Sequence, residues 1–392
     1  MRLGRSFAVA FMATLLLCGT FVGGFYAGNR VGAKSEALPG FQLFWQVHDI
    51  LAAQFSGEPP AAAKQVYAAT RGLVSSYGDP YTVFVEPDPR VFERDELRGY
   101  FGGIGATLTR DADDHLVLTV MRGRPADKAG VRDGDILVSV DGTPITAQMS
   151  VTDVALLVRG EVGSKVLLEL RRGDDAATFT VEVIRERIET ASVDWRVVDE
   201  AGAIGYIRIG LFSERTAKEL GEAIDALAGA GVQKLVLDLR GNGGGLLDSA
   251  VDTTSQFLRS GIVLREQRKD QQERFYSAKG ITTAAQSWQI AILVDGGTAS
   301  ASEIVAGALA DNERGVLIGE KTFGKGSVQQ VHELSDGSSL HVTVARWLTP
   351  NRHALDQIGL EPDIQHSLSA EDREAGRDSQ LEVAVDWLQG QQ

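Results

Sequence analysis

The first helical pattern of apolar positions lies between residues 41 and 76. Apolar side chains recur there at three- and four-residue steps, the spacing that places them on one face of a helix. These positions are Phe41, Phe44, Trp45, Val47, Ile50 and Leu51 in a first helix and Val66, Leu73 and Val74 in a second. The pair Pro59-Pro60 separates the helices, and the turn sequence at 78–80 ends the pattern. We predict a helical module over residues 38–95.

Beyond residue 102 the pattern changes to short β-like runs that alternate with Gly, Pro and Asp turns. The runs lie at residues 104–108, 116–120, 136–140, 166–170 and 178–184. Short apolar runs at regular spacing with turn signals between them are typical of a compact β domain. We predict such a domain over residues 98–186.

From residue 203 onward, strand-like and helix-like segments alternate. The predicted strands lie at 204–209, 235–239 and 292–294, and the predicted helices at 214–228, after Gly245 and from Ala301. This alternation is typical of a layered α/β domain, which we place at residues 187–367. The tail, residues 368–392, is polar and then helical around 381–388, and we expect it to be a docking helix or an oligomer contact.

The amino-terminal segment carries a membrane-targeting pattern. Residues 6–29 lack charge, and the apolar stretch 7–27 is about long enough, at roughly 1.5 Å per residue, to cross a bilayer as a helix. Arg2 and Arg5 precede it, so the positive-inside bias places the body of the chain outside the cytoplasm. Residues 1–30 are therefore a signal peptide or a membrane anchor. Because Phe25 stands where an A-x-A-like cleavage site ending at Ala27 needs a small residue, we favour the anchor.

Charge and composition exclude several classes of function. Hydrophobic residues make up 43% and charged residues 23% of the 392, as in ordinary folded proteins. The net charge of −14, with no basic stripe, argues against nucleic acid as a partner. The single cysteine, Cys18, excludes a disulfide framework and cysteine-based zinc sites, and the six histidines show no metal-ligand spacing. We expect neither a metal nor another cofactor.

A glycine-rich turn stands directly before the first predicted strand of the β domain. Backbone N–H groups in such a turn can converge on a terminal carboxylate. The sequence at 124–142 closely resembles a PDZ domain of the bacterial protease type. The resemblance implies a carboxylate-binding loop beside which a ligand adds as a strand, and the alternative is a β domain that only packs. The loop consists of Gly103, Ile104, Gly105 and Ala106.

Residues 319–326 satisfy the G-x-x-x-x-G-K pattern of a nucleotide-binding loop. That loop requires Ser or Thr after the lysine to hold magnesium, whereas Gly326 follows Lys325 here. The next residues alternate like a strand, although a phosphate loop opens a helix. We therefore discard a nucleotide site.

Ser300 lies at a predicted corner between a strand and a helix. Such a corner exposes the hydroxyl and directs backbone N–H groups and the positive helix end toward an adjacent oxyanion. A simpler interpretation exists, because Ser300 and Glu303 also have the spacing of a capping box. The glycines at 241–245 follow another predicted strand and offer further N–H groups.

Lys325 is the candidate base for a Ser300 nucleophile. A free lysine is neutral only about once in 2,500 at pH 7, so this role requires burial to lower its pKa. The apolar neighbours Phe323 and Val328 make such burial feasible. The chain thus offers a serine and a lysine but no clear histidine partner.

Three motifs together resemble the C-terminal processing peptidases, also called tail-specific proteases. They are Thr-Ala-Ser-Ala-Ser-Glu at 298–303, Lys-Thr-Phe-Gly-Lys-Gly-Ser-Val-Gln at 321–329 and Asp-Leu-Arg at 238–240. The similarity covers residues 41–364 and implies a fold of classes α/β and β: a crotonase- and Clp-protease-like α/β protease core with an inserted PDZ domain and a helical N-terminal module.

The resemblance also implies roles for single residues. Ser300 becomes the nucleophile, Lys325 the general base and Gln329 the residue that orients the lysine. The oxyanion donors become the N–H group of Ala301 and the N–H group of one glycine among residues 243–245. Gly244 and Gly245 are the candidates for that glycine. The implied substrates are exported proteins with free, rather apolar carboxyl ends.

Neighbouring residues receive other interpretations. We expect Ser302 to pack or cap, Lys321 to be solvated, and His332 and His341 to be structural residues on strands. Arg352 departs from the family, which usually has Gly at that position of the turn.

The alternative functions are a catalytically inactive, membrane-tethered PDZ scaffold and an acyl-CoA enzyme of the crotonase type. The expected location is the bacterial cell envelope, with the chain anchored to the inner membrane and facing the periplasm. We also expect a homo-oligomer.

Overall fold

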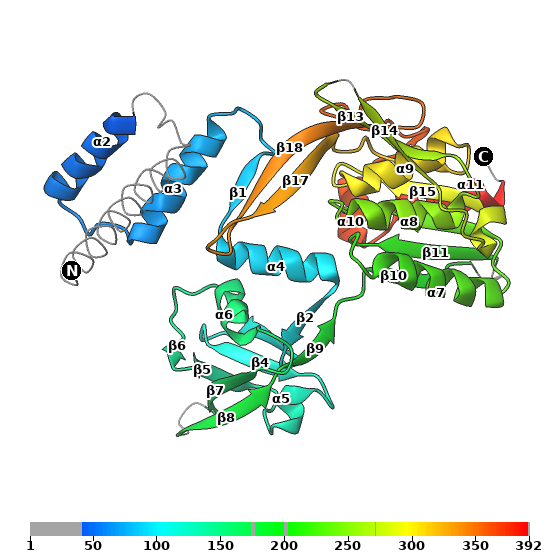
Figure 1. Ribbon diagram of the computed structural model, residues 1–392. Helices are drawn as coiled ribbons and strands as arrows, with labels where there is room; N and C mark the ends of the chain where they lie inside the picture. The colour runs from blue at the N-terminus through cyan, green and yellow to red at the C-terminus, as the bar shows by residue number, and fades with distance from the viewer. Residues whose placement is uncertain (1–40, 174–176, 200–202, 271, 391–392) are drawn as a thin grey trace, which may run out of the picture. The chain divides into compact units, whose positions relative to one another are not determined.

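The computed structural model describes residues 41–173, 177–199, 203–270 and 272–390 (Figure 1). The chain divides into two units, Met1–Ala69 and Thr70–Gln392. The predicted membrane-targeting segment at 7–27 lies outside the described residues. Within them, no helix has the length and apolar character that crossing a membrane requires.

The described part of the first unit is helical, as predicted. It contains α2 (Phe41–Gln54) and the beginning of α3 (Ala62–Ser75). None of the residues of α2 is buried, and the rings of Phe41 and Phe44 stack with their centroids 5.2 Å apart. A cavity of about 640 Å³ lies between α2 and the segment that contains Pro59, Pro60, Gln65 and Ala69. This unit therefore exposes a largely apolar helix surface.

The β domain is an antiparallel sheet with the strand order β3-β4-β5-β7-β8. Its strands are β3 (Ala106–Arg110), β4 (Leu116–Val120), β5 (Asp135–Val140), β7 (Lys165–Arg171) and β8 (Thr178–Ile184), and the short β6 (Thr143–Pro144) pairs with β5. The domain also contains the helices α5 (Pro125–Lys128) and α6 (Val151–Val158). Its hydrophobic core includes the buried Leu118, Val154 and Leu168. Each predicted strand is present within two residues of its expected start. Among the described strands β3 pairs only with β4, so it has an open edge.

A helix and a small ribbon lead into and out of this domain. The helix α4 (Pro87–Arg98) begins with a proline and ends at Gly99, which adopts the left-handed conformation with φ 72°. The strand β2 (Tyr100–Gly103) then pairs antiparallel with β9 (Glu186–Glu189), where the chain leaves the domain. Both connections of the domain are thus held together by this ribbon.

The α/β core is a six-stranded sheet with the order β10-β11-β12-β15-β16-β19. The strands are β10 (Val193–Val197), β11 (Ile204–Ile209), β12 (Lys234–Asp238), β15 (Gln289–Val294), β16 (Val316–Gly319) and β19 (Ile364–Gln365). Only β10 runs antiparallel to its neighbour; the others are parallel. The strand-helix alternation predicted from residue 203 is therefore confirmed.

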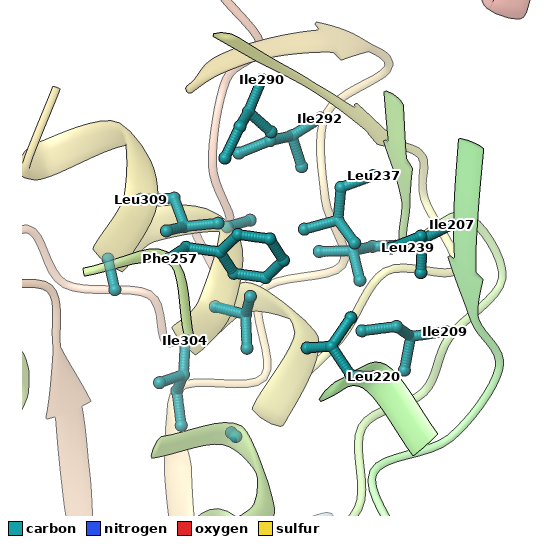
Figure 2. Packing of buried hydrophobic residues seen from close by; sticks show 14 of the residues in the cluster. Ile207, Ile209, Leu220, Leu237, Leu239, Phe257, Ile290, Ile292, Ile304 and Leu309 are labelled. Atoms are coloured by element: carbon teal, nitrogen blue, oxygen red, sulfur yellow. The ribbon is translucent and has the colours of Figure 1, made fainter. Parts of the chain in front are cut away.

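Alternate residues of the core strands pack against different helices. Leu237 and Ile292 belong to the cluster with the helices α7 (Thr216–Gly229), α8 (Leu247–Phe257) and α9 (Ala301–Asp311), and Figure 2 shows them around Phe257. Val236 and Leu293 point to the other face, where α11 (Ser379–Gln389) packs. The predicted helix at 381–388 is thus a docking helix, preceded by α10 (Ala370–Ala375).

A second sheet of the unit was only partly predicted. It has the order β1-β18-β13-β14, and β17, which lies outside this order, pairs antiparallel with β18. Its strands are β1 (Val83–Val85), β13 (Ile262–Arg268), β14 (Glu273–Ser277), β17 (Ser327–Glu333) and β18 (Ser339–Leu348). The hairpin of β13 and β14 was missed, because its many charged residues hide the alternation. Lys325 lies two residues before β17, so this sheet fixes the segment that follows the lysine.

Candidate active site

Ser300 lies on a sharp turn between the buried strand β15 and α9. Its backbone has φ 56° and ψ −117°, a conformation that costs a non-glycine residue free energy. Such strain is found most often at functional sites, where the surrounding contacts enforce it. The side chain is half-buried, whereas Ala301, the first residue of the helix, is buried. The turn therefore resembles the strained strand-to-helix turns that present catalytic serines.

The carboxylate of Glu303 connects this turn to the lysine loop. One oxygen, Oε2, accepts hydrogen bonds from the N–H groups of Ser300 at 2.9 Å and Lys325 at 2.8 Å. The other, Oε1, accepts from the N–H group of Gly324 at 2.8 Å and the hydroxyl of Thr322 at 2.5 Å. Glu303 is buried, so these four donors replace the water that a carboxylate otherwise requires. The pair Ser300 and Glu303 is thus more than the helix cap that its spacing suggests.

The side chain of Lys325 lies in a partly dry environment. Burial lowers the pKa of Lys325, and the nearby carboxylate of Glu93 on α4 opposes this effect. The nitrogen Nζ lies 5.5 Å from the centroid of the Tyr81 ring. Among the described residues, the amine forms no hydrogen bond or ion pair, including with Ser300. The structure thus connects the backbones of the two candidate residues, while the amine faces an aromatic ring.

Gln329 does not contact the lysine in this conformation. Its amide nitrogen donates to the hydroxyls of Ser327 at 2.7 Å and Thr343 at 3.3 Å. Within residues 272–390 it makes no hydrogen bond to Lys325. The orienting role that the family resemblance implies for Gln329 therefore stays a prediction.

The glycine loop at 241–245 packs directly against the serine turn. A Cβ atom on Gly244 would lie 2.8 Å from the Cβ atom of Ser300, and Gly244 has φ +111°, so no other residue fits there. The carbonyl oxygen of Asn242 accepts from the N–H group of Ala299 at 3.0 Å and from the hydroxyl of Ser302 at 2.8 Å. The loop and the turn are thus joined through both backbone and side chains.

The candidate oxyanion donors Gly244, Gly245 and Ala301 differ in whether their N–H groups already have a hydrogen-bond acceptor. The N–H group of Gly244 donates to Oδ1 of Asn242 at 2.9 Å, so it is already engaged. The carbonyl oxygen of the same residue accepts from the N–H group of Phe212 at 2.9 Å. Because the peptide bond is trans, the N–H group of Gly245 points away from Phe212. In the described parts of the chain, the N–H groups of Gly245 and Ala301 have no acceptor.

The neighbouring residues occupy the positions expected of structural groups. Ser302 is fully buried and bonded to the glycine loop, and Lys321 forms an ion pair with Glu361 at 2.7 Å. His332 is exposed on β17, and burial lowers the pKa of His341 on β18. The turn residue that departs from the family, Arg352, has φ +69° and forms an ion pair with Glu273.

The predicted carboxylate loop borders a groove of about 290 Å³ between the open edge of β3 and α6. The lining is mostly apolar and also includes Arg159. It contains the four predicted loop residues, Gly103, Ile104, Gly105 and Ala106, together with Leu108 and Val158. The N–H groups of Ile104 and Gly105 donate to no acceptor in the part of the chain that the structure describes. Gly105 requires glycine, because its φ is +70° and an added Cβ would lie 2.3 Å from the Cβ atom of Arg124.

Sequence reasoning missed three contributors to these sites. Glu303 was considered only as a cap, although its position three residues after the candidate nucleophile was visible. Tyr81 also lines a cavity of about 640 Å³ beside β18, and no local pattern relates it to Lys325. Arg159 lies over the Phe101 ring at 3.9 Å, next to the carboxylate loop. The described residues contain no cluster of three or more metal-ligating side chains.

Together, the strained serine, the lysine loop connected to it through Glu303 and the peptide-sized groove define a class of protein: a serine peptidase with a PDZ domain. Known families agree with this assignment. The model of peptidase family S41 matches residues 203–366, and that of the PDZ domain matches residues 116–172.

Two curated relatives give the same result. A C-terminal processing peptidase, chloroplastic, from Tetradesmus obliquus is 37% identical over 323 residues, which cover 79% of this chain and 69% of the relative. A probable CtpA-like serine protease from Staphylococcus aureus is 37% identical, with 76% of this chain and 59% of the relative covered. The chain thus spans less than two thirds of the staphylococcal protein.

A solved structure, of a photosystem II D1 C-terminal processing protease, is also similar. It is 34% identical, covers 88% of this chain and 92% of its own, and has a TM-score of 0.48. The chain belongs to the C-terminal processing peptidases of peptidase family S41.

Proposed function

We propose that the chain cleaves exported proteins near their carboxyl ends with Ser300 as nucleophile and Lys325 as base. The main supporting observation is the buried Glu303, whose two oxygens hold the backbones of both residues. A hydroxyl nucleophile needs an adjacent base in fixed geometry, and this carboxylate brings the two chain segments together. The names of the relatives, which include C-terminal processing, support the same reaction.

The reaction follows acyl transfer through a covalent intermediate. Neutral Lys325 accepts the proton of Ser300 Oγ as this oxygen attacks the scissile carbonyl carbon, and the protonated amine then gives the proton to the leaving amine. Water hydrolyses the resulting ester, with Lys325 again accepting a proton. The N–H groups of Ala301 and Gly245 stabilise the negative oxygen of each tetrahedral intermediate.

The lysine reaches Ser300 by a change of side-chain conformation. In the described conformation the amine faces the Tyr81 ring, and we propose that it turns toward Ser300 when substrate binds. In that state Gln329 leaves Ser327 and Thr343 and accepts a hydrogen bond from the amine, which then keeps its orientation. Burial already lowers the pKa of Lys325, the direction that a neutral base requires.

The PDZ groove captures the carboxyl end of the substrate. The terminal carboxylate accepts hydrogen bonds from the N–H groups of Ile104 and Gly105, and the preceding residues add as a strand to the open edge of β3. The apolar lining around Leu108 and Val158 favours an apolar last side chain. Arg159 contributes positive charge beside the carboxylate.

The test uses a folded reporter protein with an apolar carboxyl-terminal tail. The unmodified enzyme shortens this reporter, and Ser300→Ala lowers the rate by at least about 10³-fold, because the nucleophile is lost. Lys325→Ala causes a comparable loss, whereas His332→Ala serves as the matched control and keeps the rate. Tail binding, measured by fluorescence anisotropy, stays unchanged in Ser300→Ala.

Two results would contradict this assignment. Undiminished cleavage by Ser300→Ala would exclude this nucleophile. Tail binding without any cleavage by the unmodified chain would favour the alternative of an inactive PDZ scaffold.

We further propose that the chain is exported, with its apolar segment at 7–27 anchoring it to the inner membrane, and that it forms a homo-oligomer through its exposed amino-terminal helix. Fractionation of cells and protease accessibility of spheroplasts test the location. Light scattering of the purified protein tests the assembly. A soluble cytoplasmic product or a monomer would contradict the respective proposal.

A further inference from the structure

The helix α11 in the tail of the chain contacts both ends of the central strand β12. Near the beginning of the strand, Nζ of Lys234 donates to the carbonyl oxygen of Leu388 at 2.5 Å. Just beyond its end, Arg240 reaches Asp378, the residue that caps the amino end of α11. The helix therefore lies along this strand, with Ala384 and Leu388 buried in between.

The guanidinium group of Arg240 lies between two carboxylates. On one side it donates to Asp238, with Nε 3.0 Å from Oδ1 and Nη2 2.6 Å from Oδ2. On the other side it donates to Asp378, with Nη1 2.8 Å from Oδ1 and Nη2 2.7 Å from Oδ2. Two-point contacts of this kind fix the orientation of the planar group as well as its position.

Further polar groups complete this cluster. Gln380 accepts a further hydrogen bond from Nη1 of Arg240 at 2.9 Å, and its own amide donates to the carbonyl oxygen of His366 at 2.7 Å. The hydroxyl of Tyr206 donates to Asp238 at 2.7 Å. Asp238 is buried and Arg240 is mostly buried, so removal of a partner leaves charge that water compensates only in part.

The pKa shifts agree with this geometry. Burial lowers the pKa of Arg240, but the hydrogen bonds from its side chain to Asp378 and Asp238 outweigh burial and raise it. Burial raises the pKa of Asp378, and the hydrogen bonds from Arg240 and from the N–H group of Leu381 outweigh that effect and lower it. Both groups are thus charged at neutral pH.

The position of Arg240 gives the cluster a catalytic consequence. Arg240 directly precedes the glycine loop, which begins with the N–H group of Gly241 bonded to Asp295 at 2.9 Å. The loop supplies the N–H group of Gly245 and packs against Ser300. Oxyanion donors act by being held in place before charge develops, so a small displacement of the loop lowers the rate.

We propose that Asp378 and Gln380 are positioning residues for peptide hydrolysis, which hold the glycine loop in its active geometry through Arg240. This inference rests on the proposed function. It assigns a tail segment outside the family match at 203–366 to the support of the oxyanion site. Neither residue touches the substrate.

The decisive variant is Asp378→Ser. Serine caps a helix about as well as aspartate, so α11 keeps its cap, but its single uncharged oxygen cannot replace the two-point contact that both carboxylate oxygens of Asp378 make with Arg240. We expect kcat for the tailed reporter to fall about 10- to 100-fold, less than the 10²- to 10³-fold loss that follows deletion of an oxyanion donor. KM and the affinity for the tail peptide stay within about twofold, since the PDZ groove is unchanged. Asp386→Ser, on the exposed side of the same helix, is the matched control and keeps kcat.

A second measurement separates positioning from mere stability. A peptide boronic acid with the sequence of the mapped cleavage site binds the serine as a tetrahedral adduct and needs the oxyanion donors. Its Kd rises with Asp378→Ser by about the same factor as kcat falls. A merely structural role would reduce the folded fraction, measured by circular dichroism, and leave this Kd unchanged. The milder variant Gln380→Ala shows a smaller change in the same direction.

The outcomes keep the two proposals apart. Unchanged kcat and inhibitor affinity in folded Asp378→Ser overturn the positioning role while the proposed function stands. If the unmodified chain shows no cleavage that depends on Ser300, the proposed function fails and the positioning role fails with it. If Arg240→Ala and Asp378→Ser add fully in the double variant, the route through Arg240 is wrong, because residues that act through one contact do not add.

Discussion

The two glycine turns of this protein use the same backbone chemistry in opposite surroundings. In the PDZ domain, the turn at 103–105 lies beside an open strand edge and an apolar groove, and two of its N–H groups have no acceptor among the described residues. In the core, polar side chains hold the turn at 241–245 on several sides. These side chains come from Asp295, Asn242 and Asp378, the last acting through Arg240.

The difference follows from what each turn is proposed to bind. A terminal carboxylate is a stable charge, and a ligand that adds a strand also brings its own backbone hydrogen bonds to β3. An oxyanion exists only during the reaction, so its donors gain nothing from adapting to it and must be fixed beforehand. Glycine content alone therefore does not distinguish a binding turn from a catalytic one, whereas the surrounding polar side chains do.

The largest effect is expected at Gly244 in the core turn. The substitution Gly244→Ala places a methyl group 2.8 Å from the Cβ atom of Ser300 and strains a backbone with φ +111°. We expect kcat to fall about 10²- to 10³-fold, as in the loss of an oxyanion donor, with unchanged tail binding. Steady-state kinetics and fluorescence anisotropy measure the two quantities.

The adjacent glycine offers a matched control for this substitution. Gly243 has open space where a Cβ atom would be added and no positive φ, so Gly243→Ala keeps most of the activity. Equal losses in both variants would show that the loop is sensitive to any side chain, and the proposed contact with Ser300 would be refuted.

A smaller effect, on binding instead of chemistry, is expected at Gly105 in the PDZ turn. The substitution Gly105→Ala forces a Cβ atom to 2.3 Å from that of Arg124. We expect the Kd of the tail peptide and KM of the reporter to rise about 10-fold, which corresponds to roughly 1.4 kcal/mol, while kcat changes little.

The control Gly142→Ala introduces the same left-handed strain, with φ +78°, at a position with open space that does not line the groove beside β3. A fall in kcat with unchanged KM in Gly105→Ala would show that the two turns are not functionally separate.

The smallest effect is expected from Glu93, which raises the pKa of Lys325 and also forms ion pairs with Arg90 and His341. Lysine must be neutral to act as a base, so kcat/KM rises with pH through the lowered pKa of Lys325. Glu93 raises that pKa, and Glu93→Gln therefore shifts the acid side of the pH profile to lower pH. Glu96→Gln, on the exposed side of the same helix, leaves the profile in place. A shift to higher pH would contradict the assignment of Lys325 as the base.

The local patterns of the sequence predicted most of the fold. Short β-like runs between turn signals predicted the strands β3, β4, β5, β7 and β8 of the PDZ domain, and the alternation of strands and helices predicted the parallel core. These signals work because a buried face requires apolar residues at the period of the element. The strand β13 escaped because it carries Arg265, Glu266 and Arg268, whose charges pair within the sheet.

The candidate site was predictable only in part. Ser300, Lys325 and the glycines belong to short motifs; in the structure Glu303 connects the backbones of Ser300 and Lys325, and Asn242 joins the glycine loop to the serine turn. The pairing of Arg240 with Asp378 joins positions 138 residues apart, and no local spacing encodes it. The present contacts of Gln329 and the position of the Lys325 amine are side-chain conformations, which depend on packing that a motif does not describe.

The bond between Arg240 and Asp378 has a consequence for the newly made chain. A ribosome that adds about 5–20 residues per second delivers Asp378 on the order of 10 s after Arg240. Over the last 53 residues of that stretch, which take about 3–10 s, the nascent core contains Ser300 and Lys325 but lacks Asp378, one anchor of the glycine loop. If Asp378 positions the loop as proposed, a nascent chain that still lacks α11 hydrolyses peptides more slowly than the folded protein.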